Sequence, residues 1–283
     1  VQGNEMMKGL CRDLKVKIQY IGKLTVAQDQ TDIETLEALK AQAVVSRTYA
    51  LWSMQENRKS DYDLTDNELH QVYAGKIPGN SLYAKAANAT KSEILTWNNK
   101  LVLATYSSTC GGVTNPNESV WKGNSKPYLR SVEDRKSCSI SPHYRWDYQV
   151  NKLQLFQKID AAYSFKPAGL FIKSEEHNRV KSVRFESANG KILQLTGNDF
   201  RLFFKKHFGS HSIKSSRFTM EETEHAFKFK GSGMGHGVGL CQYGALGFAT
   251  NGWKYNKILL FYFNSVKVVD YSNIKNKRIA LAL

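Results

Sequence analysis

Two cationic side chains interrupt an apolar stripe in the first quarter of the chain. Helical spacing from Ile33 to Met54 puts Lys40 and Arg47 on one face, two turns and about 10 Å apart. A buried cation costs several kcal/mol unless it is paired or hydrogen-bonded. Two interpretations stay open. Either both side chains reach water at the edge of the stripe, or they meet a carboxylate of the protein or of a ligand in a cleft.

A glycine-rich segment surrounds a single histidine near the other end of the chain. Every second residue from Gly231 to Gly239 is glycine, with His236 among them. Glycine permits positive φ and lets backbone N–H groups approach a ligand. The segment leads into an expected helix over residues 238–250, whose N-terminus could hold an anion or a sugar oxygen. No phosphate-loop motif accompanies it, and His236 is either a ligand-binding residue or a structural turn residue.

Cysteine and histidine come together in an irregular stretch that has few apolar residues. Cys138 and His143 have a spacing compatible with zinc, and Cys110 could supply a third ligand. A Cys110–Cys138 disulfide and unmodified thiols are the alternatives.

The elements that would position these groups are both helical and extended, which indicates an α+β fold. Strands are expected over residues 15–27 and 265–270, with a hairpin over 93–106 turning at Asn98-Asn99. Helices are expected over 32–54, 82–95, 198–207, 238–250 and 254–264.

Composition excludes several classes of protein. The 283 residues are 41 % hydrophobic, enough for a sizeable core, and no apolar run approaches the roughly 18 residues of a membrane span. The formal net charge of +15 favours an anionic partner, although a solvated basic surface without a specific partner is the simpler alternative. Helix-turn-helix and RNA-binding motifs are absent from the sequence, so nucleic acid is not the expected partner.

Four segments in this order resemble the stage II sporulation protein D family of peptidoglycan lytic transglycosylases. They are residues 36–50 (LEALKAQAVVSRTYA), 71–75 (QVYAG), 107–114 (SSTCGGVT, followed by 120–121 and 128–132) and 235–245 (GHGVGLCQYGA). The resemblance covers roughly residues 15–270. It implies cleavage of the β-1,4 bond between muramic acid and glucosamine in peptide-free glycan strands, which leaves 1,6-anhydromuramic ends.

The resemblance also implies a catalytic carboxyl group. In the family, one glutamate just before the helix acts first as acid and then as base, so a second carboxylate is not required. Counted back from the helix without gaps, this position is Asp29. Aspartate is one methylene shorter than glutamate, which makes a non-catalytic peptidoglycan-binding module of the same fold the alternative function.

Further roles carry over from the family residue by residue. The groups expected to line the sugar cleft are Lys40, Gln42, Arg47, Tyr73, Ser108, His236 and Gln242. Cys110, Cys138 and His143 resemble the zinc site of some family members. Such a zinc would be structural, and the chemistry itself needs no cofactor.

The same resemblance sets the expected organisation and partners. We expect one catalytic unit over residues 1–283, with two lobes around a substrate cleft. Residues 15–145 and 231–272 would carry the cleft motifs, and 146–230 would form a basic substrate-binding lobe. The partner would be glycan strands already stripped by an amidase. We expect a cell-envelope location, periplasmic or extracytoplasmic, with any leader or anchor preceding Val1.

Overall fold

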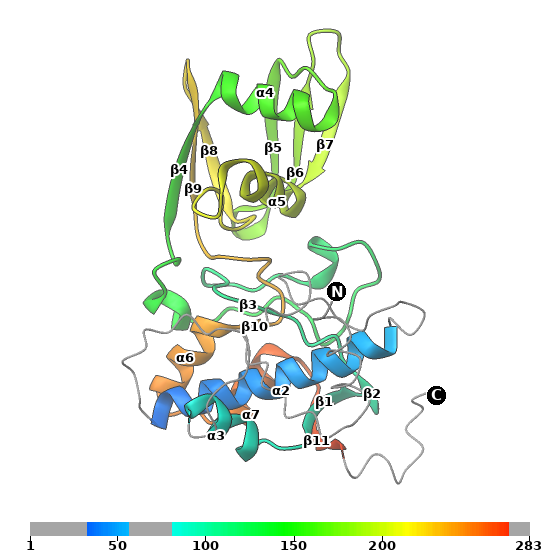
Figure 1. The fold of residues 1–283 in the computed structure, drawn as a ribbon, viewed down its shortest axis with the longest axis vertical. Coiled ribbons are helices and arrows are strands. Elements are labelled where there is room, and N and C mark those ends of the chain that lie inside the picture. Colours follow the sequence, from blue (N-terminus) through cyan, green and yellow to red (C-terminus); the bar gives the residue numbers. More distant parts are fainter. Residues whose placement is uncertain (1–32, 57–80, 272–283) are drawn as a thin grey trace, which may run out of the picture. The chain divides into compact units, whose positions relative to one another are not determined.

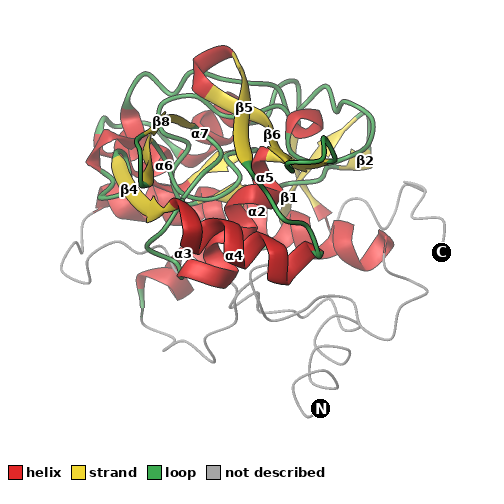
Figure 2. Ribbon diagram, turned by 90° about the horizontal axis from the view of Figure 1, so that it is seen from above, coloured by secondary structure: helices red, strands yellow, loops and turns green. Residues whose placement is uncertain are grey.

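The computed structural model describes residues 33–56 and 81–271 (Figure 1). Within these ranges the chain combines six α-helices with several small antiparallel sheets (Figure 2), which confirms the α+β class. No helix among the described residues is long and apolar enough to span a membrane. The expected strands over 15–27, the 71–75 motif, Asp29 and Tyr73 lie outside the described residues.

The described chain divides into two compact units. Unit 1 holds residues 33–56, 81–106, 127–130 and 239–271, and unit 2 holds 107–126 and 131–238. Unit 2 therefore includes the cysteine segment and most of the glycine-rich segment, both of which the sequence-based division groups with the helix motif. The short strands β3 (Tyr106–Ser107) and β10 (Leu240–Cys241) lie at the points where the chain passes between the units.

Unit 1 is built around one long helix, α2 (Ile33–Glu56), close to the helix expected over 32–54. The helix contacts α3 (Leu82–Ala89), α6 (Gln242–Thr250), α7 (Tyr255–Tyr262) and β1 (Glu93–Trp97). Small and branched apolar residues let these neighbours approach closely, and Ala41, Ala43, Val44 and Val45 are fully buried. Its sheet has the order β11-β1-β2, with β2 at Lys100–Leu101 and β11 at Lys267–Asp270.

The hairpin between β1 and β2 turns where the sequence predicts it. Asn98 and Asn99 have φ values of 48° and 59°, the pair of positive angles that a type I′ turn requires and that asparagine tolerates. The prediction of a helix over 82–95 is wrong at its C-terminal end, because α3 stops at Ala89. Thr90 closes it by hydrogen bonding to the Ala86 carbonyl, and β1 starts three residues later.

Unit 2 contains two three-stranded antiparallel sheets with two helices beside them (Figure 1). One sheet has the order β4-β9-β8, and the other β5-β6-β7. Their bounds are β4 Trp146–Asn151, β5 Gly169–Glu175, β6 Arg179–Glu186, β7 Ile192–Thr196, β8 Phe218–Glu222 and β9 Ala226–Gly231. The helices are α4 (Lys152–Tyr163) and α5 (Gly197–Phe208), and short 3₁₀ turns occur at Asn117–Ser119, Ser137–Ile140 and Glu176–Asn178.

An aromatic core joins these sheets and helices. Phe200 of α5 lies against Phe185 of β6, Phe218 of β8 and Phe229 of β9, with ring centroids 6.0–6.2 Å apart. All four rings are at most 1 % exposed. This core makes unit 2 a rigid support for the residues on the outer faces of its sheets.

Two helices differ from expectation for local reasons. The sequence analysis does not predict α4, although Asn151 caps it by accepting a hydrogen bond from the Gln154 N–H. Helix α6 starts at Gln242, four residues later than expected. Gly239 has a φ of +74°, and a Cβ there would lie 2.2 Å from the Thr105 carbonyl oxygen, so the chain cannot yet be helical.

Candidate functional site

In unit 1 the fold joins two glutamines that are 200 positions apart. The Gln242 Nε2 group, at the start of α6, donates a hydrogen bond of 3.2 Å to Gln42 Oε1 on α2. Gln42 Nε2 in turn donates to Ser46 Oγ at 2.8 Å. Ser46 also hydrogen bonds to Tyr106, and burial raises the pKa of Tyr106 well above its usual value. Gln42 is only 1 % exposed and Gln242 is 8 % exposed, so both amides are buried.

Lys40 is held by an acid of its own helix. Its Nζ lies 2.8 Å from Glu37 Oε1, and Glu37 Oε2 accepts a 2.9 Å hydrogen bond from the Tyr255 N–H at the start of α7. Burial alone would raise the pKa of Glu37, but these hydrogen bonds and the charges of Lys40 and Lys254 more than offset it, so the pKa is lowered. The carboxylate that Lys40 meets is therefore one from the protein.

Arg47 connects α2 to the elements packed beside it. Its Nη1 donates to the Glu93 carbonyl oxygen at 2.7 Å and its Nη2 to the Ala87 carbonyl oxygen at 3.4 Å. Burial lowers the pKa of Arg47 to about 10, and the charge of Glu93 partly opposes this shift. Arg47 is thus nearly buried, with two backbone carbonyls as acceptors and the charge of Glu93 nearby.

In unit 2 the glycine-rich segment runs beside the serine-cysteine segment. The Met234 N–H donates to the Thr109 carbonyl, and the Asn115 N–H donates to the Gly237 carbonyl. A Cβ on Gly233 would lie 2.6 Å from the Thr109 carbonyl oxygen, and one on Gly235 would lie 3.0 Å from the Ser107 Cβ. Both glycines have positive φ, so the two segments can approach this closely only because glycine occupies these positions.

His236 is fixed at the turn of this segment. Its Nδ1 accepts a hydrogen bond of 3.0 Å from the Val238 N–H, so the neutral ring carries its hydrogen on Nε2. The ring centroid lies 4.9 Å from that of Trp121, and Asn115 Nδ2 donates to the His236 carbonyl at 2.7 Å. The half-buried imidazole thus combines an N–H donor with a neighbouring aromatic ring, a pairing suited to sugar recognition.

Ser108 lies in a short chain of hydroxyl groups. Its Oγ is 3.3 Å from Thr109 Oγ1, which is 2.6 Å from Ser141 Oγ. The half-buried Ser108 is supported by two fully or nearly buried hydroxyls, and the chain links the serine-cysteine segment to the residues that follow Cys138.

Three groups suited to metal binding meet in the interior of unit 2. The sulfurs of Cys110 and Cys138 are 3.7 Å apart, and Asp134 Oδ2 is 3.1 Å from Cys110 Sγ. All three ligand atoms lie within 4.8 Å of one another, and none of the residues is more than 1 % exposed. Burial, together with the charge and hydrogen bond of Cys138, raises the pKa of Asp134 to about 7.

The spacing of the two sulfurs fits a shared metal. A disulfide needs about 2.05 Å between sulfurs. Two thiolates at about 2.3 Å from a tetrahedral zinc would be about 3.8 Å apart. The observed distance does not fit a disulfide, and it fits both a shared metal and two thiols in hydrogen-bond contact. The described group contains Asp134 and does not contain His143, which the sequence analysis names as a ligand together with Cys138 and Cys110.

His143 is placed elsewhere in the same unit. Its Nδ1 is buried without a hydrogen-bond partner among the described residues, while its backbone carbonyl accepts from the Gly233 N–H. Burial, and then the charges of Lys214 and His211, lower its pKa, so it is neutral at pH 7. Sequence reasoning missed Asp134 although its place four residues before Cys138 is a spacing typical of metal ligands.

Comparison with known proteins gives a consistent result. The family model described as "Stage II sporulation protein" matches residues 16–97. A stage II sporulation protein D of Bacillus amyloliquefaciens is 30 % identical over 86 % of this chain and 72 % of its own length. An amidase enhancer of Bacillus subtilis is 28 % identical over 84 % of this chain and 38 % of its own length.

An uncharacterized protein of Brachyspira hyodysenteriae is 31 % identical over 86 % of this chain. The chain spans 64 % of that relative and 38 % of the amidase enhancer. The family match, the extent of the alignments and the order of the motifs agree, and the chain belongs to the stage II sporulation protein D family.

Proposed function

We propose that the chain is a peptidoglycan lytic transglycosylase that acts on glycan strands without stem peptides. The observation that carries this proposal is membership of the stage II sporulation protein D family over most of the chain. The positively charged chain fits a substrate whose muramic acid residues carry lactyl carboxylates.

In the proposed reaction Asp29 acts twice. As an acid it protonates the glycosidic oxygen, the bond from this oxygen to C1 of muramic acid breaks, and the glucosamine end leaves as an alcohol. The 6-hydroxyl of the same muramic acid then attacks C1 and gives its proton to Asp29, which restores the acid. No water enters the bond, so the product ends in a 1,6-anhydro ring.

His236 and Ser108 are proposed to contact the sugar from unit 2. The neutral imidazole, with its hydrogen on Nε2, would donate to a sugar oxygen, while Trp121 offers an aromatic ring 4.9 Å away for the apolar face of the pyranose. Asn115 and the Val238 N–H hold the histidine in this orientation. Tyr73 remains a proposed substrate contact.

The unit 1 residues receive more specific proposed roles. Gln242 is the proposed sugar contact, and buried Gln42 positions its amide. Lys40 and Arg47 were expected to bind substrate. Lys40 pairs with Glu37, which accepts a hydrogen bond from the start of α7, and Arg47 donates to carbonyls of β1 and α3. These contacts support instead a role in holding α2 against its neighbours, in the part of the chain that follows Asp29.

A structural metal is part of the proposal. Cys110, Cys138 and Asp134 would hold zinc, and a bound zinc would add rigidity by tying together three separate points of an irregular segment. The chemistry of the glycosidic bond needs no contribution from it. Within the chain itself, the Cys138 N–H and the Lys136 N–H donate to the two oxygens of Asp134 and fix this carboxylate.

The proposed partners follow from the same reaction. Peptide-free strands arise when an amidase removes stem peptides, and the relative named amidase enhancer fits a shared pathway with such an enzyme. Peptidoglycan lies in the cell envelope, so we propose a periplasmic or extracytoplasmic location.

The test compares wild type with variants at position 29 on purified peptide-free strands, with products identified by mass spectrometry. Wild type should release fragments with 1,6-anhydromuramic ends, and Asp29→Ala and Asp29→Asn should release none. Asp29→Glu, which restores the family residue, should retain activity. Anhydro ends from Asp29→Ala would remove Asp29 from the mechanism.

A binding module of the same fold is the second candidate, favoured by the shorter carboxyl side chain at position 29. A displacement of about 1 Å can cost roughly 100-fold in rate. This candidate predicts that wild type binds the strands without cleaving them, and that Asp29→Ala binds equally well.

A further inference from the structure

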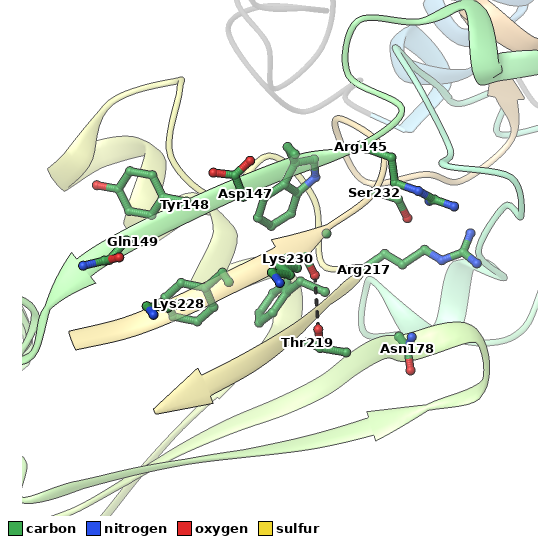
Figure 3. A pocket seen from close by; sticks show the side chains of 14 residues that line it. Arg145, Asp147, Tyr148, Gln149, Asn178, Arg217, Thr219, Lys228, Lys230 and Ser232 are labelled. Carbon is green, nitrogen blue, oxygen red and sulfur yellow. Dashed lines mark hydrogen bonds between the residues drawn. The ribbon is translucent and has the colours of Figure 1, made fainter. Parts of the chain in front are cut away.

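One face of the β4-β9-β8 sheet carries a basic groove that the proposed site does not use. The groove has a volume of about 660 Å³ and is lined by residues of all three strands (Figure 3). Side chains alternate across the sheet. Lys228 and Lys230 of β9 are exposed, whereas Phe227 and Phe229 between them are buried in the aromatic core.

Register places the remaining polar groups beside these lysines. Lys230 pairs with Asp147 on one side and Thr219 on the other, and Lys228 pairs with Gln149 and Glu221. Trp146 of β4 and Phe218 of β8 both pair with Gly231, so these two strands start at the same end of the sheet. The residues just before them, Arg145 and Arg217, therefore share this end, as Figure 3 shows.

Arg217 is held in place without an acid. Its Nε donates to the His177 carbonyl at 2.8 Å and its Nη1 to the Gly111 carbonyl at 2.7 Å. Arg145 lies over the Tyr144 ring, 4.6 Å from its centroid. None of the cations Arg145, Arg217, Lys228 and Lys230 forms an ion pair with a described acid. Four positive charges thus line one groove, with Asp147 in its lining and Glu221 beside Lys228 as the acids of the same sheet face, which leaves an excess of positive charge.

The uncharged residues that line the groove indicate which class of polyanion fits it. Gln149, Thr219 and Asn178 are exposed and can hydrogen bond to hydroxyl or amide groups. Of the aromatic residues at the groove, Trp146, Phe218 and Phe229 are at most 7 % exposed. Tyr148 is half-buried with its ring packed against Phe204 of the core, so the groove offers little aromatic surface on which nucleic acid bases could stack. Cations interspersed with hydroxyl and amide side chains match an acidic sugar better than a nucleic acid.

The groove is also long enough for a chain. From Lys228 to the level of Ser232, where Arg145 and Arg217 lie, β9 advances four residues, about 13 Å. A polymer with acid groups at intervals could contact both the lysines and the arginines.

We propose that this groove binds a linear glycan whose repeating units carry carboxylates, at a site separate from His236 and Ser108. The positive groove follows from the sheet alone, and the choice of a carboxylate glycan among polyanions rests on the proposed function. The groove gives a specific surface to the basic lobe expected over residues 146–230.

Binding of the full chain to fluorescently labelled, peptide-free glycan strands tests the proposal. The variant is Lys228→Gln with Lys230→Gln, and the matched control is Lys158→Gln with Lys173→Gln, two exposed lysines of unit 2 outside the groove. Both pairs remove two positive charges. The groove variant should raise Kd about 5- to 10-fold, and the control should change it less than twofold.

Three comparisons complete the test. Strands with esterified carboxyl groups should bind the wild type about as weakly as intact strands bind the groove variant. Equal weakening by the control pair would overturn the groove, because only net charge would then matter. Equally tight binding of poly(glycerol phosphate) or of single-stranded DNA would overturn the assignment to a carboxylate glycan.

Binding is measured with the Asp29→Ala variant as background, so cleavage does not enter the result. Groove-dependent binding without anhydro products from wild type would leave this inference standing and defeat the proposed function. If wild type cleaves the strands but the groove variant does not change Kd, the proposed function stands and the groove inference fails.

Discussion

Buried and half-buried cations have different partners in the two units of this chain. In unit 1, Lys40 is paired with Glu37, and Arg47 donates to two backbone carbonyls next to the acid Glu93. In unit 2, Arg179 and Arg217 donate to carbonyls of the loop that holds Cys110. Burial and then the charge of Arg217 lower the pKa of Arg179, and burial and then the charge of Arg145 lower the pKa of Arg217. Lys40 of unit 1 thus has an acid partner, as Lys152 of unit 2 has in Glu222, whereas Arg179 and Arg217 have no ion pair among the described residues.

This difference indicates that paired and unpaired cations have different roles in the two units. Cations that are already satisfied hold a framework together, whereas cations without an acid partner raise the local potential for an anionic ligand. Unit 1 would then supply rigidity to the segment that follows Asp29, and unit 2 would supply most of the attraction for an acidic glycan.

The largest effect is expected at the proposed metal ligands of unit 2. Cys138→Ala removes a ligand from a fully buried group, and should eliminate bound zinc and destabilise the chain by more than about 4 kcal/mol. Metal content and thermal unfolding measure both results. Two results would contradict the metal site. Wild type would contain no zinc after purification with added zinc, or its Tm would not change when a chelator is added.

Arg47→Ala should give the next largest effect. It leaves the half-buried Glu93 and Ala87 carbonyls without their side-chain donor and should cost about 3 kcal/mol of unfolding free energy in urea. Because the role is structural, the glycan Kd of the folded variant should not change. A variant of normal stability with weakened glycan binding would instead restore Arg47 as a substrate contact.

Glu37→Gln should give a smaller loss that depends on pH. The folded-state pKa of Glu37 is lowered, so its ionised form stabilises the fold above the ordinary value of 4.5, and this contribution is lost as pH falls through the lower folded value. The variant should be about 1–2 kcal/mol less stable than wild type at pH 7, and the difference should shrink toward pH 3. A difference that stays constant over this range would contradict the ion pair.

The smallest stability effect is expected in the basic groove. Lys228 and Lys230 are exposed and form no described ion pair, so replacing both with glutamine should change the unfolding free energy by less than about 0.5 kcal/mol. If the same variant also binds the glycan more weakly, Lys228 and Lys230 serve ligand binding and do not stabilise the fold. A marked loss of stability would show that unit 2 also uses its cations to hold the fold.

The sequence predicts best where local chemistry decides the structure. The Asn98-Asn99 turn and α2 follow from residues close together in the chain, and α+β follows from their mixture. The contacts of Glu37, Arg47 and Gln42 with Tyr255, Glu93 and Gln242 join positions that only folding brings together. Periodicity identifies such side chains as unusual without naming their partners.

The metal site shows the same limit. Cys110 and Cys138 are recognisable as a pair, but His143 is the more conspicuous third ligand in the sequence. Asp134 joins the sulfurs because the turn from 134 to 138 folds back, with the Cys138 N–H donating to its carboxylate. The catalytic position, Asp29, and Tyr73 stay predictions from the sequence, since both lie outside the described residues.

The most direct test of the central claim is cleavage of peptide-free glycan strands in ¹⁸O-labelled water, followed by mass spectrometry of the new ends. The proposed reaction closes the ring with the substrate's own 6-hydroxyl, so the account predicts 1,6-anhydromuramic ends that carry no label. New reducing ends that contain ¹⁸O would show hydrolysis by water and contradict it.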